Sequence, residues 1–174
     1  AGLRPGQKLA AAQALLAHFD AVEYDPAATE RWHRLLAAWA YRYSAEVALW
    51  PRAIVLEVSK SLGLFGPWPK FERQLRNDLT ELGFRHHIAL APTARGAHVL
   101  AGMHDGLAVT TPDALHSALL SVPVGKARLP GQAADSLAGM GLRTLGQLLR
   151  APRDGLRRLF GDELTAHLDY LTGT

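Results

Sequence analysis

The stretch YRYSAEVALWPRAIVLEVSKSLGLFG, which runs from Tyr41 to Gly66, decides the fold of this chain. Within it, Glu46–Trp50 and Ala53–Ser59 are short apolar runs with β-branched residues, and Pro51 and Arg52 separate them. The pattern predicts two short strands joined by a tight turn, or one strand that a proline interrupts. In both interpretations a β segment divides the helical regions of the chain.

Helical patterns lie on both sides of this stretch. Apolar residues recur at helical spacing in Gln7–Phe19 and Ala27–Tyr43, which predicts two opening helices. Further helices are predicted for Pro67–Leu82 and Thr93–Met103, with a strand over Phe84–Ala91 between them. This mixture of helices and strands indicates the α+β class.

The C-terminal third has a different pattern. From Thr111 onward, short amphipathic segments are separated by Pro and Gly, and the strand pattern is absent from the sequence. We therefore expect a small helical unit after a boundary near Gly106 to Pro112. The predicted organisation is residues 1–44, residues 45–110 and residues 111–174.

Length and composition limit the classes to which this protein can belong. The chain has 174 residues, 48% of them hydrophobic, which is enough to bury a core. It has no cysteine, so disulfides and thiolate metal sites are excluded. Its apolar runs are short of the roughly 20 residues of a membrane span, and its first residues lack the apolar core of a signal peptide. These features predict a cytoplasmic protein without a membrane segment.

Positive charge is concentrated near the C-terminus, although the net charge is only +3. Residues 1–59 carry six basic and six acidic side chains, whereas residues 143–158 carry five arginines and a single acid, Asp154. The arginines are Arg143, Arg150, Arg153, Arg157 and Arg158. Such a cluster is typical of phosphate contacts or of a solvated helix face, and the pattern leaves both open.

Other residues that could support chemistry have unfavourable spacing. His86 and His87 are adjacent on a predicted strand and face opposite sides, and His98 and His104 are six residues apart. The run from Lys60 to Gly63 lacks the glycines of a phosphate-binding loop. The residues therefore predict neither a metal site nor a cofactor.

Four segments in order resemble parts of one protein family. Residues 2–15 (GLRPGQKLAAAQAL) resemble its fingers segment, and residues 41–66 its palm hairpin. Residues 86–101 (HHIALAPTARGAHVLA) resemble the strand and helix that follow, and residues 129–152 (LPGQAADSLAGMGLRTLGQLLRAP) a thumb with a helix-hairpin-helix. The chain thus resembles the DinB/UmuC (Y-family) DNA polymerases, most closely their ImuB-like branch.

The resemblance implies a fold and a division of the chain. It implies fingers and a connecting helix in residues 1–44, a partial palm in residues 45–110 and a helical thumb in residues 111–174. The palm would be a ferredoxin-like sheet without its first strand. The family's first metal-binding aspartate precedes the fingers, so we expect it outside this sequence, and the chain to be a fragment.

The resemblance also bears on catalysis. The palm hairpin of active members reads S-I-D-E-A-x-L-D-(I/V)-(S/T). Aligning its end with Leu56 to Ser59 places the Asp-Glu pair on Arg52 and Ala53. Polymerases hold two Mg²⁺ ions through carboxylate oxygens, which neither residue supplies, and Arg52 would repel a cation. Glu57 keeps the family's later acidic position. We therefore predict that the chain is not an enzyme.

The thumb resemblance implies DNA contacts. A helix-hairpin-helix binds phosphates through backbone N–H groups of a Gly-x-Gly turn. Gly131 matches the first glycine, and Ala133 replaces the second. Gly131 and the five arginines are the candidate contacts for weak, non-specific DNA binding. A thumb kept only for packing or partner binding is the other interpretation.

For function, the resemblance implies a non-catalytic accessory or scaffold protein in the translesion synthesis mutasome. The implied partners are a RecA-like protein (ImuA), an error-prone polymerase (ImuC) and the sliding clamp. One alternative is a fragment of an active lesion-bypass polymerase. The other is a sequence-independent DNA-binding module.

Overall fold

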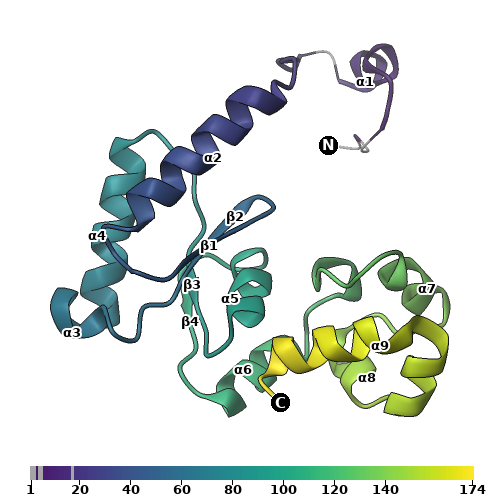
Figure 1. Ribbon diagram of the computed structural model, residues 1–174. Coiled ribbons are helices and arrows are strands. Elements are labelled where there is room, and N and C mark those ends of the chain that lie inside the picture. The colour runs from purple at the N-terminus through teal and green to yellow at the C-terminus, as the bar shows by residue number, and fades with distance from the viewer. Residues whose placement is uncertain (1–2, 4–5, 17) are drawn as a thin grey trace.

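The structure is a computed structural model that describes residue 3, residues 6–16 and residues 18–174. The predicted fingers segment and first helix fall partly on Gly2, Arg4, Pro5 and Ala17, which lie outside the described residues. The fold is mixed α/β, with many helices and small sheets (Figure 1). The elements are α1 (Leu9–Leu15), α2 (Pro26–Ala40), β1 (Val47–Trp50), β2 (Ala53–Leu56), α3 (Leu62–Phe65), α4 (Trp68–Glu81), β3 (Ala89–Leu90), α5 (Ala94–Ala101), β4 (Leu107–Ala108), α6 (Pro112–Leu119), the 3₁₀ helix η1 (Val124–Lys126), α7 (Ala133–Gly139), α8 (Leu145–Leu149) and α9 (Arg153–Thr172).

Helix starts follow local capping chemistry. The Asp25 side chain accepts a hydrogen bond from the Ala28 N–H at the start of α2. Thr93, Thr111 and Thr144 cap α5, α6 and α8 in the same way. Because capping residues are visible in the sequence, the starts of these helices could be predicted to within a few residues. Helix α2 ends three residues earlier than predicted.

The hairpin consists of β1 and β2, paired antiparallel from Val47↔Leu56 to Trp50↔Ala53. This confirms two strands joined by a tight turn. The second sheet is a parallel pairing of β3 with β4. The predicted strand over Phe84–Ala91 is wrong for most of its length, since only Ala89–Leu90 is a strand. Within the described residues the two pairs are separate two-stranded sheets, so a single ferredoxin-like palm sheet is not confirmed.

Side chains explain why the predicted strand is so short. The Ile88 N–H donates to the Asp105 carboxylate at 2.8 Å, and a ring nitrogen of His86 lies 3.0 Å from the Phe84 carbonyl oxygen. These bonds occupy groups that a neighbouring strand would otherwise pair with. Strand β4 was not predicted, because a strand of two residues is too short to show the alternation of apolar and polar side chains.

Buried side chains form two clusters. The smaller contains Tyr43, Val58, Phe71 and Leu75 and packs the residues that follow α2 and β2 against α4. The larger is mainly leucine and valine and joins α5 to α9. Helix α5 contacts both β2 and α9, so it connects the hairpin to the C-terminal helices (Figure 1). The predicted domain limits stay a prediction.

In the described part of the chain, no helix combines the length and the apolar character needed to cross a bilayer.

Candidate functional site

The first two predicted site residues lie at the tip of the hairpin, Arg52 in the turn and Ala53 at the start of β2. Pro51 and Arg52 connect Trp50 to its partner Ala53, and Arg52 has a positive φ of 61°. A type II turn requires a positive φ at its second central position, and proline is common at the first. Arg52 is exposed. The turn therefore presents a guanidinium group and the methyl group of Ala53, and no carboxylate.

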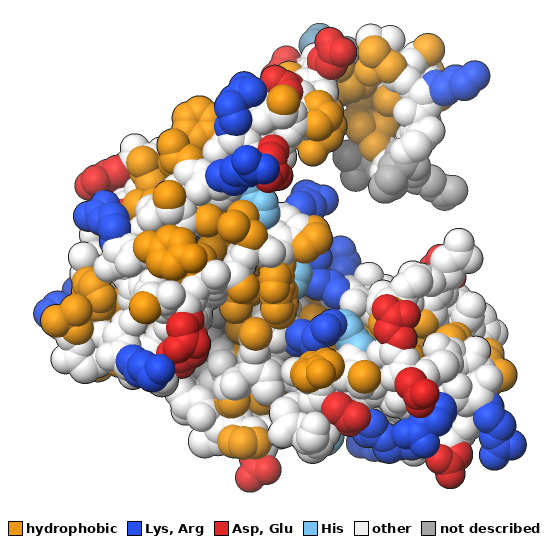
Figure 2. All heavy atoms as spheres, viewed as in Figure 1, with side chains coloured by type: hydrophobic (Ala, Val, Ile, Leu, Met, Phe, Trp, Pro, Cys, Tyr) orange, Lys and Arg blue, Asp and Glu red, His pale blue; other side chains and the backbone are white. Residues whose placement is uncertain are grey.

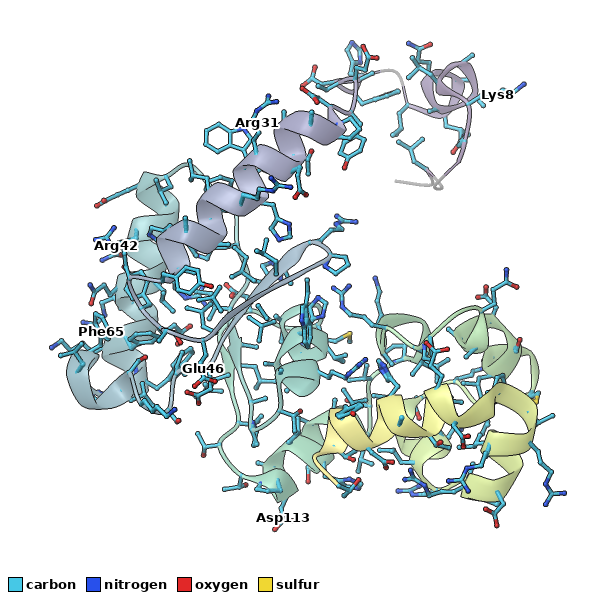
Figure 3. The ribbon with its side chains drawn as sticks, viewed as in Figure 1. Lys8, Arg31, Arg42, Glu46, Phe65 and Asp113 are labelled. Atoms are coloured by element: carbon cyan, nitrogen blue, oxygen red, sulfur yellow. The ribbon has the colours of Figure 1, made fainter. Side chains whose placement is uncertain are left out.

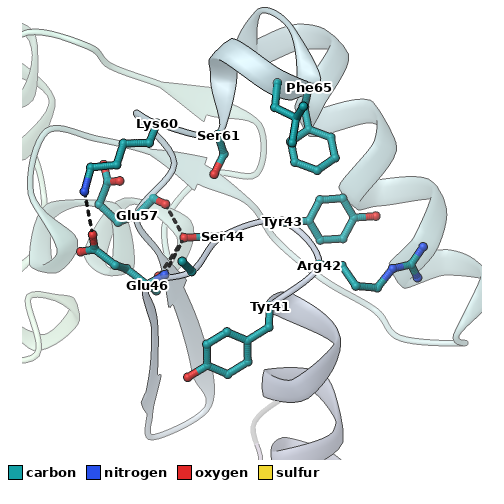
Figure 4. A pocket seen from close by; sticks show the side chains of 11 residues that line it. Tyr41, Arg42, Tyr43, Ser44, Glu46, Glu57, Lys60, Ser61 and Phe65 are labelled. Carbon is teal, nitrogen blue, oxygen red and sulfur yellow. Dashed lines mark hydrogen bonds and ion pairs between the residues drawn. The ribbon is translucent and has the colours of Figure 1, made fainter.

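The base of the hairpin is fixed by a buried hydroxyl group. Ser44 is 6% exposed, and its hydroxyl donates to the Glu57 carbonyl oxygen at 2.5 Å and accepts from the Glu46 N–H at 3.0 Å. The backbone bond from the Glu57 N–H to the Glu46 carbonyl lies beside it. Figure 4 shows Ser44 between the two glutamates. Ser44 thus connects the end of α2 to both strands.

Glu57, the third predicted position, lies at this base. Its carboxylate accepts a hydrogen bond from the Ser59 N–H at 3.0 Å, and hydrogen bonding by Ser59 holds the pKa of Glu57 below its ordinary value. Glu57 lies four residues after Ala53, which is roughly 13 Å along an extended strand. The structure therefore does not bring Arg52 and Ala53 together with Glu57.

A hollow of about 290 Å³ opens beside the hairpin base. Its wall includes Tyr41, Ser44, Glu46, Glu57 and Lys60 (Figure 4). Lys60 forms an ion pair with Glu46 at 3.1 Å, so the charges on this wall largely neutralise each other. Figure 3 shows Glu46 at the end of the hairpin away from the turn.

Next to this hollow, Tyr43 ties α2 to α4. Its hydroxyl donates to the Asp78 carboxylate, which Arg42 approaches at 3.5 Å. Burial, followed by the hydrogen bond to Asp78, raises the pKa of Tyr43 to about 12. This network was missed in the sequence, because its partners are 35 residues apart and lack a motif.

The C-terminal arginines divide into two groups. Arg153 pairs with Asp169 at 2.5 Å, and Arg157 pairs with Asp162 at 2.7 Å. The side chains of Arg143, Arg150 and Arg158 make no ion pair with any residue that the structure describes. In Figure 2, basic side chains gather with acidic ones at the edge of the C-terminal helices.

The predicted helix-hairpin-helix turn lies at a second hollow, of about 300 Å³. Gly131 has a positive φ of 56°, and a Cβ added to it would meet open space. Ala133 is 6% exposed, so its methyl group is in the core. Glu163 contributes a carboxylate to the same wall. The Gly131 backbone is accessible, but an acidic side chain lies near it.

The histidines that the sequence singled out make local contacts. A ring nitrogen of His87 lies 3.2 Å from the Ala101 carbonyl oxygen, and His98 packs against Trp50. Among the described residues, no three His, Asp or Glu side chains are grouped as metal ligands.

Comparison with known proteins shows which proteins this chain is similar to. No protein-family model matches the chain. Protein ImuB of Caulobacter vibrioides strain NA1000 / CB15N is 32% identical over 173 residues, which is 99% of this chain. Protein ImuB of C. vibrioides strain ATCC 19089 / CIP 103742 / CB 15 shows the same identity and coverage. The chain is ImuB-like. It spans 38% of the length of these ImuB proteins.

Proposed function

We propose that this ImuB-like chain is part of a non-catalytic accessory protein in DNA damage tolerance, which binds protein partners during translesion synthesis. The similarity to ImuB over nearly the whole chain supports a role in DNA damage tolerance. The residues at the hairpin turn support the absence of catalysis. The proposal depends most on one observation, which is that Arg52 and Ala53 occupy the tip of the hairpin and supply no carboxylate there.

The hairpin geometry argues against two-metal chemistry on this palm. Two-metal nucleotidyl transfer needs carboxylates that hold ions about 4 Å apart. In the proposed alignment, a guanidinium at Arg52 replaces one ligand, and Glu57 lies roughly 13 Å along the strand from Ala53. A cation at the turn would meet positive charge, which supports a role other than nucleotide transfer.

An accessory role requires partners, and the resemblance suggests a RecA-like protein (ImuA), an error-prone polymerase (ImuC) and the sliding clamp. Trp32 and Leu35 on α2 are 55% and 45% exposed. Exposed tryptophan is enriched at the energetic centres of protein interfaces, so this supports protein binding in general.

Association with these partners is the direct test. Tagged full-length protein would be captured from cells after DNA damage, with and without nuclease, and the three candidates would be quantified. We expect at least one to be retained after nuclease treatment, because protein contacts do not need a DNA bridge. Loss of all three after nuclease treatment would contradict the proposal.

A second candidate function is sequence-independent DNA binding by the C-terminal helices. Two observations favour it: the Gly131 backbone is accessible, and Arg143, Arg150 and Arg158 form no ion pair with a residue that the structure describes. Binding driven by phosphate contacts weakens steeply as salt rises, whereas apolar partner binding does not. The salt dependence of duplex binding therefore distinguishes this candidate from the first.

A further inference from the structure

The hollow at the base of the hairpin has an apolar rim. Leu64 on α3 is 82% exposed, Tyr41 directly after α2 is 59% exposed, and both side chains line the hollow. A single exposed apolar residue is ordinary on a protein surface. Two of them beside a concave wall combine the apolar contact area and the enclosure that the centres of protein interfaces use.

The floor of this hollow is rigid. Phe65 lies on its wall and packs against Tyr43, with ring centroids 5.6 Å apart, and against Phe71 at 5.3 Å. Tyr43 and Phe71 are buried, so these rings cannot move without opening the smaller buried cluster. Ser44 fixes the adjoining wall at the base of the hairpin (Figure 4). A site that is already formed loses little conformational entropy when a partner binds.

The wall of the hollow has one negative charge that is not matched. Lys60 pairs with Glu46, and Arg42 pairs with Asp78, which lies outside the lining. Glu57 forms no ion pair with any residue that the structure describes. Its carboxyl group is ionised at neutral pH. The complementary group on a partner is therefore a lysine or an arginine.

The size of the hollow limits what it can hold. Its volume is about 290 Å³, which is at the lower end of the range of small-molecule sites. We therefore expect it to accept one large side chain and not a cofactor. The adjacent charge of Glu57 then requires the basic group to lie close to that side chain in the partner.

We propose that this hollow docks a segment of a partner protein in which an apolar side chain stands next to a lysine or an arginine. The apolar side chain would contact Tyr41 and Leu64, and the basic group would pair with Glu57. The inference rests on the proposed accessory function and specifies where on this chain a partner binds. The hollow lies at the end of the hairpin away from the turn (Figure 3). A nucleic acid is disfavoured here, because Glu57 repels phosphate.

Binding of the three implied partners to full-length protein tests the site. Each purified partner would be immobilised and titrated with full-length protein by biolayer interferometry, in the presence of nuclease. Leu64→Ser and Tyr41→Ala should each weaken the binding of one partner by roughly tenfold, because a few central apolar contacts dominate the affinity of an interface. Glu57→Gln keeps a hydrogen-bond acceptor and removes the charge, and should weaken it by about threefold.

A matched variant controls for the loss of an exposed leucine. Leu159 on α9 is 67% exposed and lines the second hollow, so Leu159→Ser makes the same change at a different surface. It should alter the affinity by less than about twofold. Because Tyr41, Leu64 and Leu159 are all exposed, the melting temperatures of their variants should stay within about 2 °C of the parent. A loss of affinity at constant melting temperature reports a lost contact and not a lost fold.

A charge exchange tests the predicted chemistry of the partner. Overlapping synthetic peptides of the responding partner would be titrated against full-length protein by fluorescence anisotropy. The peptide that binds should contain an apolar residue next to a lysine or an arginine. Replacing this basic residue by glutamate should weaken binding to the parent about tenfold, and Glu57→Lys should restore most of it. Such a recovery requires direct contact between the two positions.

The possible failures of this inference and of the accessory function are distinct. If a partner binds the parent and binds Leu64→Ser and Tyr41→Ala equally well, the docking site is wrong and the accessory function stands. An equal loss in Leu159→Ser, or no recovery in the charge exchange, would also overturn the site. Self-association of the parent that Leu64→Ser abolishes would assign the hollow to a second copy of the chain instead. If none of the three partners binds the parent, the accessory function itself fails.

Discussion

The two buried clusters of the molecule stabilise their surroundings in different ways. The cluster around the hairpin is small and aromatic: Phe71 packs against Tyr43 at 5.7 Å and against Phe65 at 5.3 Å between ring centroids. The cluster of the C-terminal helices is larger and aliphatic, with fully buried leucines on several helices. The hairpin therefore depends on a few rings and one hydroxyl group, whereas the C-terminal helices share their stability among many contacts.

The largest effect is expected from removing the central ring of the smaller cluster. Phe71→Ala should lower the free energy of unfolding by about 3–5 kcal/mol and increase amide exchange across Trp50 to Leu56. Leu137→Ala, in the larger cluster, should cost about 2–5 kcal/mol and leave the hairpin amides protected. Urea denaturation and hydrogen exchange measure both. Equal loss of hairpin protection in the two variants would contradict the distinction.

An intermediate effect is expected at the hairpin base. Ser44→Ala removes the hydroxyl group between the Glu46 N–H and the Glu57 carbonyl and leaves these part-buried polar groups without that partner. We expect a loss of about 1–3 kcal/mol in the free energy of unfolding. Ser121→Ala, at an exposed position, is the control and should change it by less than about 0.5 kcal/mol. A Ser44→Ala variant as stable as the control would show that this clamp does not hold the strands.

The smallest effect concerns pH and tests the contact between the hairpin and α5. Burial, followed by the positive charge of Arg128, lowers the pKa of His98 to about 4 from an ordinary 6.5. Below pH 6.5 the unfolded chain takes up a proton at this position that the folded chain refuses. Stability from a neutral His98 is therefore present above pH 6.5 and is lost as the pH falls toward 4. Thermal melts at pH 7.5 and pH 5 should show a smaller decrease in His98→Gln than in the parent, and equal decreases would contradict the assignment.

How far the sequence could predict the structure differs between elements. Helices with a capping residue, such as α2 after Asp25 and α8 after Thr144, could be predicted because the bonds that start them are local. The hairpin could be predicted because Pro51 divides two apolar runs. The shortness of β3 could not, since it depends on Asp105, which is 17 residues away from Ile88 in the chain.

The candidate site was only partly predictable for the same reason. The resemblance gave Arg52, Ala53 and Glu57 without showing that the first two lie at the turn and the third at the base. The arginine cluster was visible as composition, but its pairing with Asp162 and Asp169 was not. Nothing in the sequence indicates that Arg128 has a positive φ, because the side chain type is an unusual one for that conformation.

Primer extension by the natural full-length protein is the most direct test of the central claim, which is the proposal that a hairpin with Arg52 and Ala53 at these positions supports no polymerase activity. The unmodified protein and the variant Arg52→Asp/Ala53→Glu would be assayed on an undamaged template with Mg²⁺. We expect no incorporation by either protein, because restoring two carboxylates does not rebuild the surrounding groups that hold two metals in position. Clear nucleotide incorporation by the unmodified protein, free of contaminating polymerase, would contradict the claim.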